Sequence, residues 1–422
     1  MASSILVLNC GSSSVKFNLF LIGADRVLQP VLQGIAEEIG HTSRSRLKFD
    51  WHGERQVVSQ PIADHRSALL GIFAVMDQLG IERGSIKAVG HRVVHGGEQY
   101  CASVRVDAHV LETIRRLIPI APLHNPPNLT GLEESIRLLP DVPQVAVFDT
   151  AFHESMPEYA YRYAIPATWY ERYGVRKYGF HGTSHMYVAK RAARLLGIPF
   201  ARFNGITAHL GNGCSITKIE NGRSVDTSMG FTPLEGVIMG TRSGDIDPAL
   251  IGYVANRIAQ DESISREKAY DTVMQALNKD SGLKALAQTN MMQDIRVKAL
   301  AGDAAADRVI DIYAYRVARY IGQYWATLLW ADAIVFTAGL GENEGYVRKK
   351  ILAFLANLNI IVDDQQNDRR KAEVIIGRSE IRPDHPLSIL VIPTDEECVI
   401  GYDALYLGYL QETLPAVYPF ET

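Results

Sequence analysis

A strand-turn-strand pattern that occurs twice constrains the fold of this chain more than any other feature. Residues 5–20 read Ile-Leu-Val-Leu-Asn-Cys-Gly-Ser-Ser-Ser-Val-Lys-Phe-Asn-Leu-Phe, an apolar strand, a small polar turn and an alternating second strand. This pattern predicts a β-hairpin with a polar tip. Gly11 lets a ligand approach the backbone closely, Ser12 offers a hydroxyl and an N–H group, and Lys16 brings a positive charge. Such a tip suits phosphate.

The second occurrence lies at residues 205–219, where an apolar strand runs into Gly211-Asn212-Gly213-Cys214-Ser215 and then into another strand. Either turn alone is most simply an ordinary Ser-rich or Gly-rich turn. Because the two occurrences lie 200 residues apart, we interpret them as the same hairpin in two duplicated domains that face one nucleotide.

Composition narrows the class of protein. A chain of 422 residues allows two or three domains. With 43 basic and 47 acidic residues and no long run of either sign, the charge favours neither nucleic acid nor an anionic membrane as a partner.

The four cysteines form no CxxC pair, which fits reduced thiols and disfavours a zinc site. No secretory signal is apparent, and the apolar stretch 320–331 is too short to span a bilayer. We expect a cytoplasmic protein.

Hydrophobic periodicity predicts the remaining elements. Residues 26–60 alternate and should complete an antiparallel or mixed sheet. Further strands are expected from residue 86 and at 144–148, 205–210, 216–219, 333–337 and 387–392, and helices at 67–79, 111–117, 186–196, 248–259, 265–278, 304–330 and 395–410. Thr183 or Ser184 is the candidate N-cap of the helix at 186–196. The apolar face of the longest helix belongs to the core or to a dimer contact; its residues are Ile310, Ala314, Val317, Ile321 and Leu328.

Several loops combine rigidity with chemistry. Residues 90–97 are Gly-rich and carry a basic cluster, and the prolines of residues 121–127 should stop regular structure and stiffen the backbone. Asp149 follows the buried strand 144–148, at the end of a strand where ligands bind in open α/β sheets, although a structural cap explains it equally well. Residues 205–244 are dense in glycine, which is typical of binding loops. Residues 333–343 read as a buried strand, a Gly turn and the start of a helix.

Six motifs, taken in order along the chain, resemble those of the acetate kinase family. They are residues 9–16 (Asn-Cys-Gly-Ser-Ser-Ser-Val-Lys), 90–97 (Gly-His-Arg-Val-Val-His-Gly-Gly), 178–185 (Tyr-Gly-Phe-His-Gly-Thr-Ser-His), 209–213 (His-Leu-Gly-Asn-Gly), 240–245 (Gly-Thr-Arg-Ser-Gly-Asp) and 339–343 (Gly-Leu-Gly-Glu-Asn). The resemblance covers nearly the whole chain, and several of its motifs are eight residues long.

The resemblance implies an α/β fold in which two duplicated ribonuclease-H-like domains of the actin and hexokinase type flank a nucleotide cleft. The expected N-terminal domain comprises residues 1–150 with 397–422 and binds the acyl substrate and the phosphates. The expected C-terminal domain comprises residues 151–396, with the nucleotide side and the dimer contacts. The implied protein is a cytoplasmic homodimer with no nucleic-acid or membrane partner.

The implied activity is a reversible, direct in-line transfer of the γ-phosphoryl group of ATP to the carboxylate of acetate, which gives acetyl phosphate and ADP. Because transfer of this kind depends on positioning and charge neutralisation, cations on Gly-rich loops are the expected clamp. The implied catalytic residues are Arg92, His124, Asp149, His181 and Arg242. A carboxylate substrate is already ionised at neutral pH and needs no base, so we expect Asp149 to orient groups or to bind a magnesium-bound water.

The resemblance also assigns the ligands. Asn9 and Glu396 are the expected ligands of Mg²⁺, with Mn²⁺ as a substitute. The expected nucleotide contacts are Ser12, Lys16, His209, Leu210, Gly211, Asn212, Gly213, Asp294, Ile295, Arg296, Gly339, Leu340, Gly341, Glu342 and Asn343. The family usually has Gly and Ser residues before the triplet 294–296, whereas this chain has Ala-Gln-Thr-Asn-Met-Met-Gln at 287–293.

The implied acyl pocket consists of Arg92, Val94, Leu123, Phe180 and Pro233. Because propionate kinases often carry a smaller residue at the position of Val94, this pocket should prefer acetate, though only modestly. Three other classes stay open on the sequence: a kinase for propionate or another short-chain fatty acid, a sugar kinase of the same superfamily, and a non-catalytic nucleotide-binding or chaperone-like module.

Overall fold

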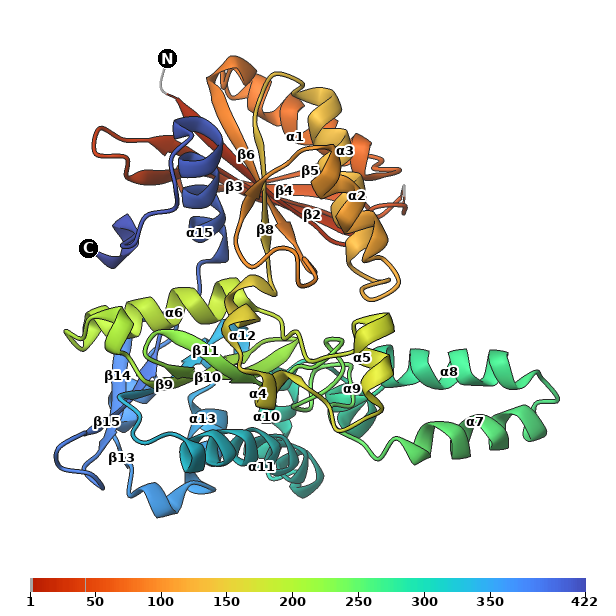
Figure 1. The fold of residues 1–422 in the computed structure, drawn as a ribbon, viewed down its shortest axis with the longest axis vertical. Helices are drawn as coiled ribbons and strands as arrows, with labels where there is room; N and C mark the ends of the chain where they lie inside the picture. Colours follow the sequence, from red (N-terminus) through yellow and green to blue (C-terminus); the bar gives the residue numbers. More distant parts are fainter. Residues whose placement is uncertain (1–2, 42) are drawn as a thin grey trace. The chain divides into compact units, whose positions relative to one another are not determined.

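The computed structural model describes residues 3–41 and 43–422. It contains two compact units, Met1–Glu154 with Asp395–Thr422, and Ser155–Thr394, each built on one sheet (Figure 1). Across the described part of the chain, none of the helices combines the length and the apolar character needed to cross a membrane.

The first unit is built on a mixed sheet of order β5-β4-β3-β2-β1-β6-β8-β7. Strands β1, β6 and β8 are parallel, and the hairpin strands β2 to β5 extend the sheet antiparallel on one side. The strands are β1 Ser4–Cys10, β2 Ser14–Ile22, β3 Leu28–Glu37, β4 Arg46–Trp51, β5 Glu54–Ser59, β6 Ile86–Val93, β7 Val104–Arg105 and β8 Gln144–Phe148. The helices are α1 His65–Gln78, α2 Ala108–Arg116, α3 Asn125–Leu138 and α15 Glu396–Asp403.

Both faces of this sheet are covered by apolar cores, and the side chains of β1 contribute alternately to the two. Leu6 and Leu8 belong to a core cluster that includes the inward side chains of α1, whereas Ile5 and Val7 belong to a second cluster with Ile400 of α15. Since successive side chains of a strand point to opposite faces, one apolar strand supplies both cores. Helix α15, which comes from the end of the chain, therefore packs on the first sheet.

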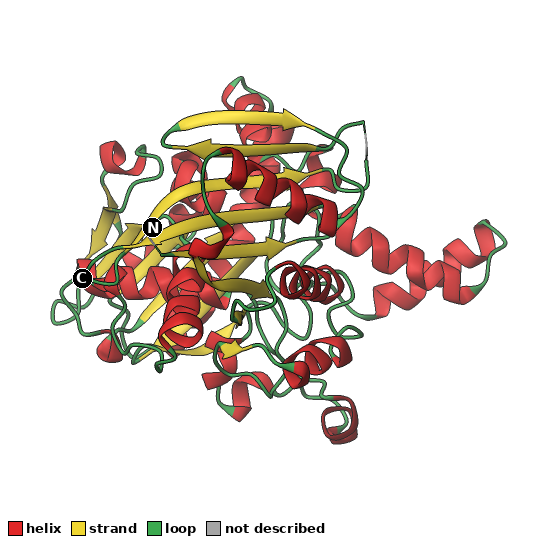
Figure 2. Ribbon diagram, turned by 90° about the horizontal axis from the view of Figure 1, so that it is seen from above, coloured by secondary structure: helices red, strands yellow, loops and turns green. Residues whose placement is uncertain are grey.

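The second unit repeats this plan with the order β11-β10-β9-β12-β15-β14-β13. Its strands are β9 Gly205–Leu210, β10 Cys214–Glu220, β11 Arg223–Thr227, β12 Ala333–Thr337, β13 Ile361–Val362, β14 Val374–Ser379 and β15 Leu387–Val391. Its helices are α4 Glu158–Tyr161, α5 Ala167–Tyr173, α6 Gly182–Leu195, α7 Ala249–Asp261, α8 Arg266–Lys279, α9 Gly282–Ala287, α10 Met292–Leu300, α11 Ala304–Thr327, α12 Ala338–Asn343, α13 Gly345–Ala353 and α14 Asp364–Asn367. Figures 1 and 2 both show α7 and α8 as a helical hairpin that projects away from the strands.

The duplication predicted from the two hairpins is confirmed by the topology. The five strands β3-β2-β1-β6-β8 correspond in order and direction to β11-β10-β9-β12-β15. Both hairpin tips are three residues long and close in a similar way, with Gly11 N–H donating to the Ser14 carbonyl (2.8 Å) and Gly211 N–H to the Gly213 carbonyl (3.0 Å).

Three local predictions were wrong. Residues 121–124 lie outside helices and strands as predicted, but the break does not extend to 127: α3 begins at Asn125 and has proline in its first turn, where a missing N–H costs nothing. Helix α6 begins at Gly182, with His181 at its N-cap, so Thr183 and Ser184 lie inside the helix. No Gly turn follows β12; α12 starts at Ala338, whose φ of 64° lies in the left-handed region that is rare for alanine.

The long helix matches its prediction apart from three residues at its end. The predicted apolar face of α11, with Ile310, Ala314, Val317 and Ile321, is buried within the chain. It therefore forms core, and this face gives no support to a dimer contact.

The predicted C-terminal helix is α-helical only as far as Asp403, and a π-helical segment, Ala404–Leu410, follows it directly. The remaining 3₁₀ segments are Arg83–Ser85, Ala151–Ser155, Phe200–Arg202, Ala356–Leu358 and Pro419–Glu421.

Candidate active site

The first unit collects polar side chains at the carboxyl ends of its three parallel strands. Asn9 lies at the end of β1, Arg92 near the end of β6, and Asp149 directly after β8, while Glu396 opens α15. Ligands of open α/β sheets bind at this edge because the strand ends leave a crevice there. Four residues predicted from distant motifs therefore meet within one unit.

Arg92 is the centre of this group. Its Nε donates to Asp149 Oδ1 at 3.0 Å and its Nη2 to Asp149 Oδ2 at 2.5 Å, a bidentate pair. Nη1 lies 3.5 Å from Asn9 Oδ1, and Nε lies 3.6 Å from Glu396 Oε2. The Asp149 side chain is 1% exposed, whereas that of Arg92 keeps 20% exposure. The fork geometry fixes the plane of the guanidinium, which leaves part of it open to a ligand.

The charges of this group depend on each other. Burial alone would lower the pKa of Arg92, but the charges of Asp149 and Glu396 outweigh burial and raise it. Burial raises the pKa of Asp149 to about 6, although the Arg92 charge acts in the opposite direction. Burial, with the charge of Glu396, also raises the pKa of Glu397. One cation is thus held among three carboxyl groups.

The loop after β6 is held by a residue that the sequence motifs did not identify. Asn128 of α3 accepts a hydrogen bond from the Val94 N–H at 3.0 Å and donates to the Cys10 carbonyl at 2.7 Å. It therefore ties the loop carrying Val94 to the end of β1. Val94 is buried, Leu123 is 45% exposed, and His124 is the N-cap residue of α3.

The tip of the first hairpin offers polar groups on the same sheet. Ser12 is exposed at the tip, and Lys16 of β2 pairs in register with Asn9 of β1. Residues that face each other across two antiparallel strands point to the same face, so Lys16 and Asn9 share one side of the sheet. The charge of Lys16 also acts to lower the pKa of Glu397, which places the amine near α15.

In the second unit, three histidines form a connected cluster beside the second hairpin. His181 Nδ1 and His185 Nε2 both contact Ser215 Oγ, at 2.8 and 2.7 Å. The rings of His181 and His209 stack with centroids 4.1 Å apart. His209 Nδ1 contacts Ser184 Oγ at 2.8 Å. His181 is thus fixed in position, with a left-handed backbone (φ 58°) at the start of α6.

Arg242 approaches the same hairpin tip. A Cβ built on Gly213 would lie 3.2 Å from His181 Nε2 and 3.6 Å from Arg242 Nη1, so both side chains border this glycine. Arg242 Nη1 donates to the Pro233 carbonyl at 3.3 Å, and no ion pair of Arg242 occurs within residues 3–41 and 43–422. Burial lowers its pKa. A desolvated guanidinium without a carboxylate partner is suited to an anionic ligand.

The loop that carries Arg242 is held by backbone contacts. The N–H groups of Ser281, Leu283 and Lys284 at the start of α9 donate to the carbonyls of Thr241, Met239 and Gly240. Gly240 N–H in turn donates to the Asn212 carbonyl at 3.0 Å, which links this loop to the hairpin tip. The predicted segments 209–213 and 240–245 therefore lie together.

Two predicted nucleotide segments also meet this tip. A Cβ built on Gly211 would be 3.7 Å from Ala338 Cβ, and one on Gly341 would be 3.7 Å from Leu210 Cβ, so the start of α12 borders the hairpin. The Glu342 carboxylate accepts from Thr394 N–H at 3.1 Å. Leu210 and Ile295 are both buried in this structure.

The atypical segment 287–293 contacts the site as well. Asn290 Nδ2 donates to Asn212 Oδ1 at 3.3 Å, and Thr289 Oγ1 donates to Asp294 Oδ2 at 3.4 Å. Arg296 forms an ion pair with Glu344 at 2.7 Å. A cavity of about 480 Å³ is lined by Arg296, Leu300, Asn343, Glu344, Gly345, Tyr346, Lys349, Asp364, Asn367, Asp368 and Arg370. A larger cavity of about 970 Å³ at β13 and β14 contains none of the predicted site residues.

Comparison with known proteins shows which family this chain belongs to. The description of the matching family model is the acetokinase family, and the match spans residues 4–402. This chain belongs to the acetokinase family. The resemblance inferred from the six motifs is thereby confirmed.

Characterised relatives cover nearly the same length. The acetate kinase of Pseudothermotoga lettingae is 46% identical over 404 residues, which are 94% of this chain and 96% of that protein. The acetate kinase of Thermotoga maritima is 46% identical over 407 residues, 94% of this chain and 97% of that protein.

Solved structures of acetokinase family members share the fold. A propionate kinase from Francisella tularensis is 40% identical with a TM-score of 0.85, covering 95% of this chain and 98% of that one. The Porphyromonas gingivalis acetate kinase is 38% identical with a TM-score of 0.85, covering 96% of this chain and 99% of that one. The predicted fold class, two duplicated α/β domains of the actin and hexokinase type, is confirmed.

Sequence reasoning missed residues whose only signal was their place in a motif. Ser184 and His185 belong to the quoted motif 178–185, and Ser215 follows the second tip, so each could have been suspected as a neighbour of a site residue. Asn128 carried no signal of any kind, because a polar residue in an amphipathic helix is ordinarily exposed.

Proposed function

We propose that this chain is an ATP-dependent acetate kinase. It transfers the γ-phosphoryl group of ATP reversibly to the carboxylate of acetate and yields acetyl phosphate and ADP by direct in-line transfer. The observation that carries the proposal is the Arg92 guanidinium, held by Asp149 beside Asn9 and Glu396 at the carboxyl ends of β1, β6 and β8. A fixed, partly open guanidinium is what a small carboxylate requires.

In the first unit, Arg92 orients the acetate carboxylate and neutralises charge on the migrating phosphoryl group. Asp149 holds Arg92 through both oxygens and so fixes the guanidinium plane. Acetate is already ionised at neutral pH, so Asp149 does not act as a general base. His124, at the start of α3, assists Arg92 in charge neutralisation.

The donor set of the first unit fits a magnesium ion. Within the described residues, no cluster of three or more His, Cys, Asp or Glu side chains is arranged to hold a metal. Mg²⁺ does not need such a cage, since it usually keeps several waters and takes one or two protein oxygens. Asn9 and Glu396 supply those oxygens, and Asp149 can accept from a bound water. When bound, Mg²⁺, or Mn²⁺ in its place, neutralises phosphate charge.

In the second unit, Arg242 and His181 act on the phosphoryl group as it moves. Both border Gly213, and burial already disfavours solvation of Arg242. A cation that has lost its water shell stabilises developing phosphate charge without reorganisation. His181 donates a hydrogen bond to the transition state, while Ser215 fixes its opposite ring nitrogen.

The nucleotide binds at the tips and at α12. Ser12 and Lys16 of the first tip and residues 209–213 of the second serve the phosphates. Residues 339–343 and 294–296 serve the adenosine, a proposal supported by the 480 Å³ cavity that Arg296 and Asn343 line together. One carboxylate oxygen of Asp294 accepts a hydrogen bond from Thr289, and one of Glu342 accepts a hydrogen bond from Thr394.

Four apolar residues serve the methyl group of the acid: Val94, Leu123, Phe180 and Pro233. Val94 is larger than the residue that propionate kinases often carry at its position, which favours acetate. Propionate is the second candidate, because the Francisella tularensis relative with a TM-score of 0.85 is a propionate kinase.

We further propose that the first unit is the acyl and phosphate side, that the second unit is the nucleotide and dimer side, and that the protein acts in the cytoplasm as a homodimer. The four free cysteines support a reducing compartment.

A hydroxamate assay tests the activity. Purified protein is incubated with Mg·ATP, hydroxylamine and either acetate, propionate or no acid, and acyl hydroxamate and ADP are measured together. We expect hydroxamate in proportion to ADP, with acetate preferred to propionate. ADP release that is indifferent to either acid would contradict the proposal and support a chaperone-like ATPase.

A further inference from the structure

The hydroxyl of Tyr163 closes a turn in the second unit. None of the roles proposed above involves this residue. The Tyr163 hydroxyl accepts a hydrogen bond from the Phe231 N–H at 2.9 Å and donates one to Glu235 Oε2. Residues 231 and 235 are the two ends of a five-residue turn, and Pro233 lies at its middle.

Gly230 leaves room for this phenol and its carboxylate partner. A Cβ built on Gly230 would lie 2.1 Å from the Tyr163 hydroxyl and 1.7 Å from Glu235 Oε2, so a larger residue there would displace both side chains. The Gly230 carbonyl accepts from the N–H groups of Tyr178 and Gly179, at 3.1 and 3.2 Å. The turn is therefore tied to the segment that leads into Phe180.

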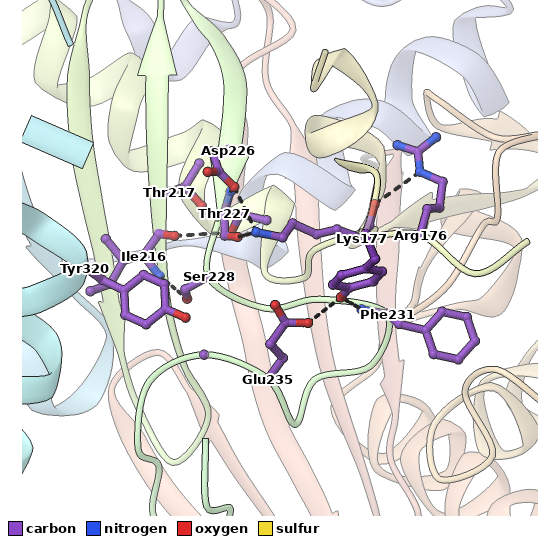
Figure 3. A network of polar contacts seen from close by, with 12 residues as sticks. Arg176, Lys177, Ile216, Thr217, Asp226, Thr227, Ser228, Phe231, Glu235 and Tyr320 are labelled. Carbon is purple, nitrogen blue, oxygen red and sulfur yellow. Dashed lines mark hydrogen bonds and ion pairs between the residues drawn. The ribbon is translucent and has the colours of Figure 1, made fainter. Parts of the chain in front are cut away.

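That segment is itself anchored to the sheet. Lys177 Nζ donates to Asp226 Oδ1 at 3.0 Å and to the Thr227 carbonyl at 2.9 Å, at the end of β11 (Figure 3). The Lys177 charge also acts to keep Glu235 ionised, against the burial that raises the pKa of this carboxyl. Tyr163 thus joins the turn to a support that is fixed at a strand.

The turn determines where the Arg242 guanidinium lies. Arg242 Nη1 donates to the carbonyl of Pro233, at 3.3 Å. Within the described residues, the other hydrogen-bonded contact of this guanidinium is the Met239 sulfur, at 3.8 Å, a weak acceptor. The carbonyl of Pro233 is therefore the stronger of the two orienting contacts, and its position follows from the closure of the turn.

We propose that Tyr163 is a positioning residue for phosphoryl transfer: by closing the turn 231–235 it places the Pro233 ring for the acid and the Pro233 carbonyl for Arg242. This inference rests on the proposed function, which assigns Pro233 to the acid and Arg242 to the phosphoryl group. Tyr163 acts only through these two residues.

Tyr163→Phe removes the hydroxyl and keeps the ring. Since one of its two bonds is to a carboxylate, we expect kcat/KM for acetate to fall by about tenfold or more, with unchanged KM for ATP and a Tm lowered by the loss of a buried hydrogen bond. The matched control is Tyr324→Phe, because Tyr324 is a buried tyrosine of α11 whose hydroxyl has no hydrogen-bond partner among the described residues. We expect this variant to match the wild type.

A second variant weakens the same contact without removing the phenol. Glu235→Gln keeps an acceptor oxygen but loses the charge, so it should lower kcat/KM for acetate by a smaller factor, about threefold. If Tyr163→Phe behaves like Tyr324→Phe, the proposal is overturned. It is also overturned if Tyr163→Phe lowers Tm while kcat and both KM values stay at wild-type levels, because a merely structural residue behaves in this way.

A double-mutant cycle separates this proposal from the function on which it rests. Pro233→Ala should raise KM for acetate, and adding Tyr163→Phe should then cost much less than in the wild type, since both act through one turn. If Pro233→Ala leaves KM for acetate unchanged, the assignment of the acyl pocket fails. If Pro233→Ala raises it but the effects of the two changes multiply independently, only the positioning by Tyr163 is refuted.

Discussion

At the scale of single residues, the candidate site depends on charges whose interactions are strengthened by burial, and we predict that packing selects the acid. The bidentate pair of Arg92 and Asp149 is the clearest example of the first. Motif reasoning identified both residues but could not show that Asp149 uses both oxygens on Arg92. That contact depends on the register of β6 against β8, which brings Arg92 level with Val147.

Val94 tests the packing at this scale. Val94→Ala removes two methyl groups from a buried side chain, and we expect the kcat/KM ratio of propionate to acetate to rise by about tenfold. The measurement is the hydroxamate assay with each acid. Val89→Ala is the control, because Val89 is equally buried on β6 but belongs to the core cluster under α1. An unchanged ratio in Val94→Ala would remove the steric explanation of acid preference.

His91 gives the protein a pH-dependent stability. It is buried next to Arg92, its Nε2 bonds to Gln144 Oε1 at 2.7 Å, and burial lowers its pKa from 6.5 to about 4. The unfolded chain therefore binds a proton between pH 6.5 and 4 that the folded chain does not bind. The free energy of unfolding should thus fall by roughly 3 kcal/mol as the pH drops through this window, and should be unaffected by His91 above it.

Urea unfolding measured between pH 4 and 7.5 tests this prediction. In His91→Gln the unfolding free energy should lose the corresponding part of its pH dependence, even if the variant is less stable throughout. An identical pH slope in the wild type and in His91→Gln would show that His91 is not the group responsible.

At the scale of elements, the two hairpins and the long periodic helices were predictable, because each carries its own pattern. Short elements were not. Helices α4, α9 and α14 have four to six residues, too few to show a period of 3.6. Helix α3 was missed because Pro126 and Pro127 were read as breakers, although prolines are tolerated in the first turn of a helix.

Helix α3 offers an element-scale prediction. It packs on β1 at Gly131, where an added Cβ would lie 2.3 Å from Cys10 Sγ. Gly131→Ala should therefore push the helix from the strand and lower the free energy of unfolding by about 1–3 kcal/mol. It should also reduce activity, since α3 carries Asn128, which ties β1 to the loop of Val94.

The control for this prediction is Gly252→Ala in α7. This helical glycine has no atom within 4 Å of the Cβ position, so alanine should be neutral or stabilise the protein by up to about 1 kcal/mol. Urea unfolding of the two variants compares them directly. Equal changes in the free energy of unfolding for the two variants would mean that the contact of Gly131 with β1 does not limit how closely α3 packs on the strand.

At the scale of the whole molecule, the duplicated fold followed from one repeated turn, and the family followed from six motifs. What could not be predicted is how residues of different motifs join, as when Asn290 of the atypical segment 287–293 meets Asn212 at the second tip. Such contacts depend on packing between loops that share no sequence pattern. Tyr163 escaped notice for the same reason.

The homodimer is a prediction at this scale. The face of α11 that suggested it is buried within the chain, so the proposed dimer would need another surface. We expect light scattering to give twice the chain mass of 46.7 kDa, independent of protein concentration in the micromolar range. A mass of one chain would refute the dimer without affecting the chemistry proposed for Arg92.

The central claim is that a carboxylate oxygen of acetate attacks the γ-phosphorus of ATP. ³¹P NMR of the product formed from ¹⁸O-labelled acetate and Mg·ATP tests it most directly. The account predicts an acyl phosphate resonance with the isotope shift of one ¹⁸O in the bridging position. Inorganic phosphate as the only new phosphorus species, with or without acetate, would contradict the account.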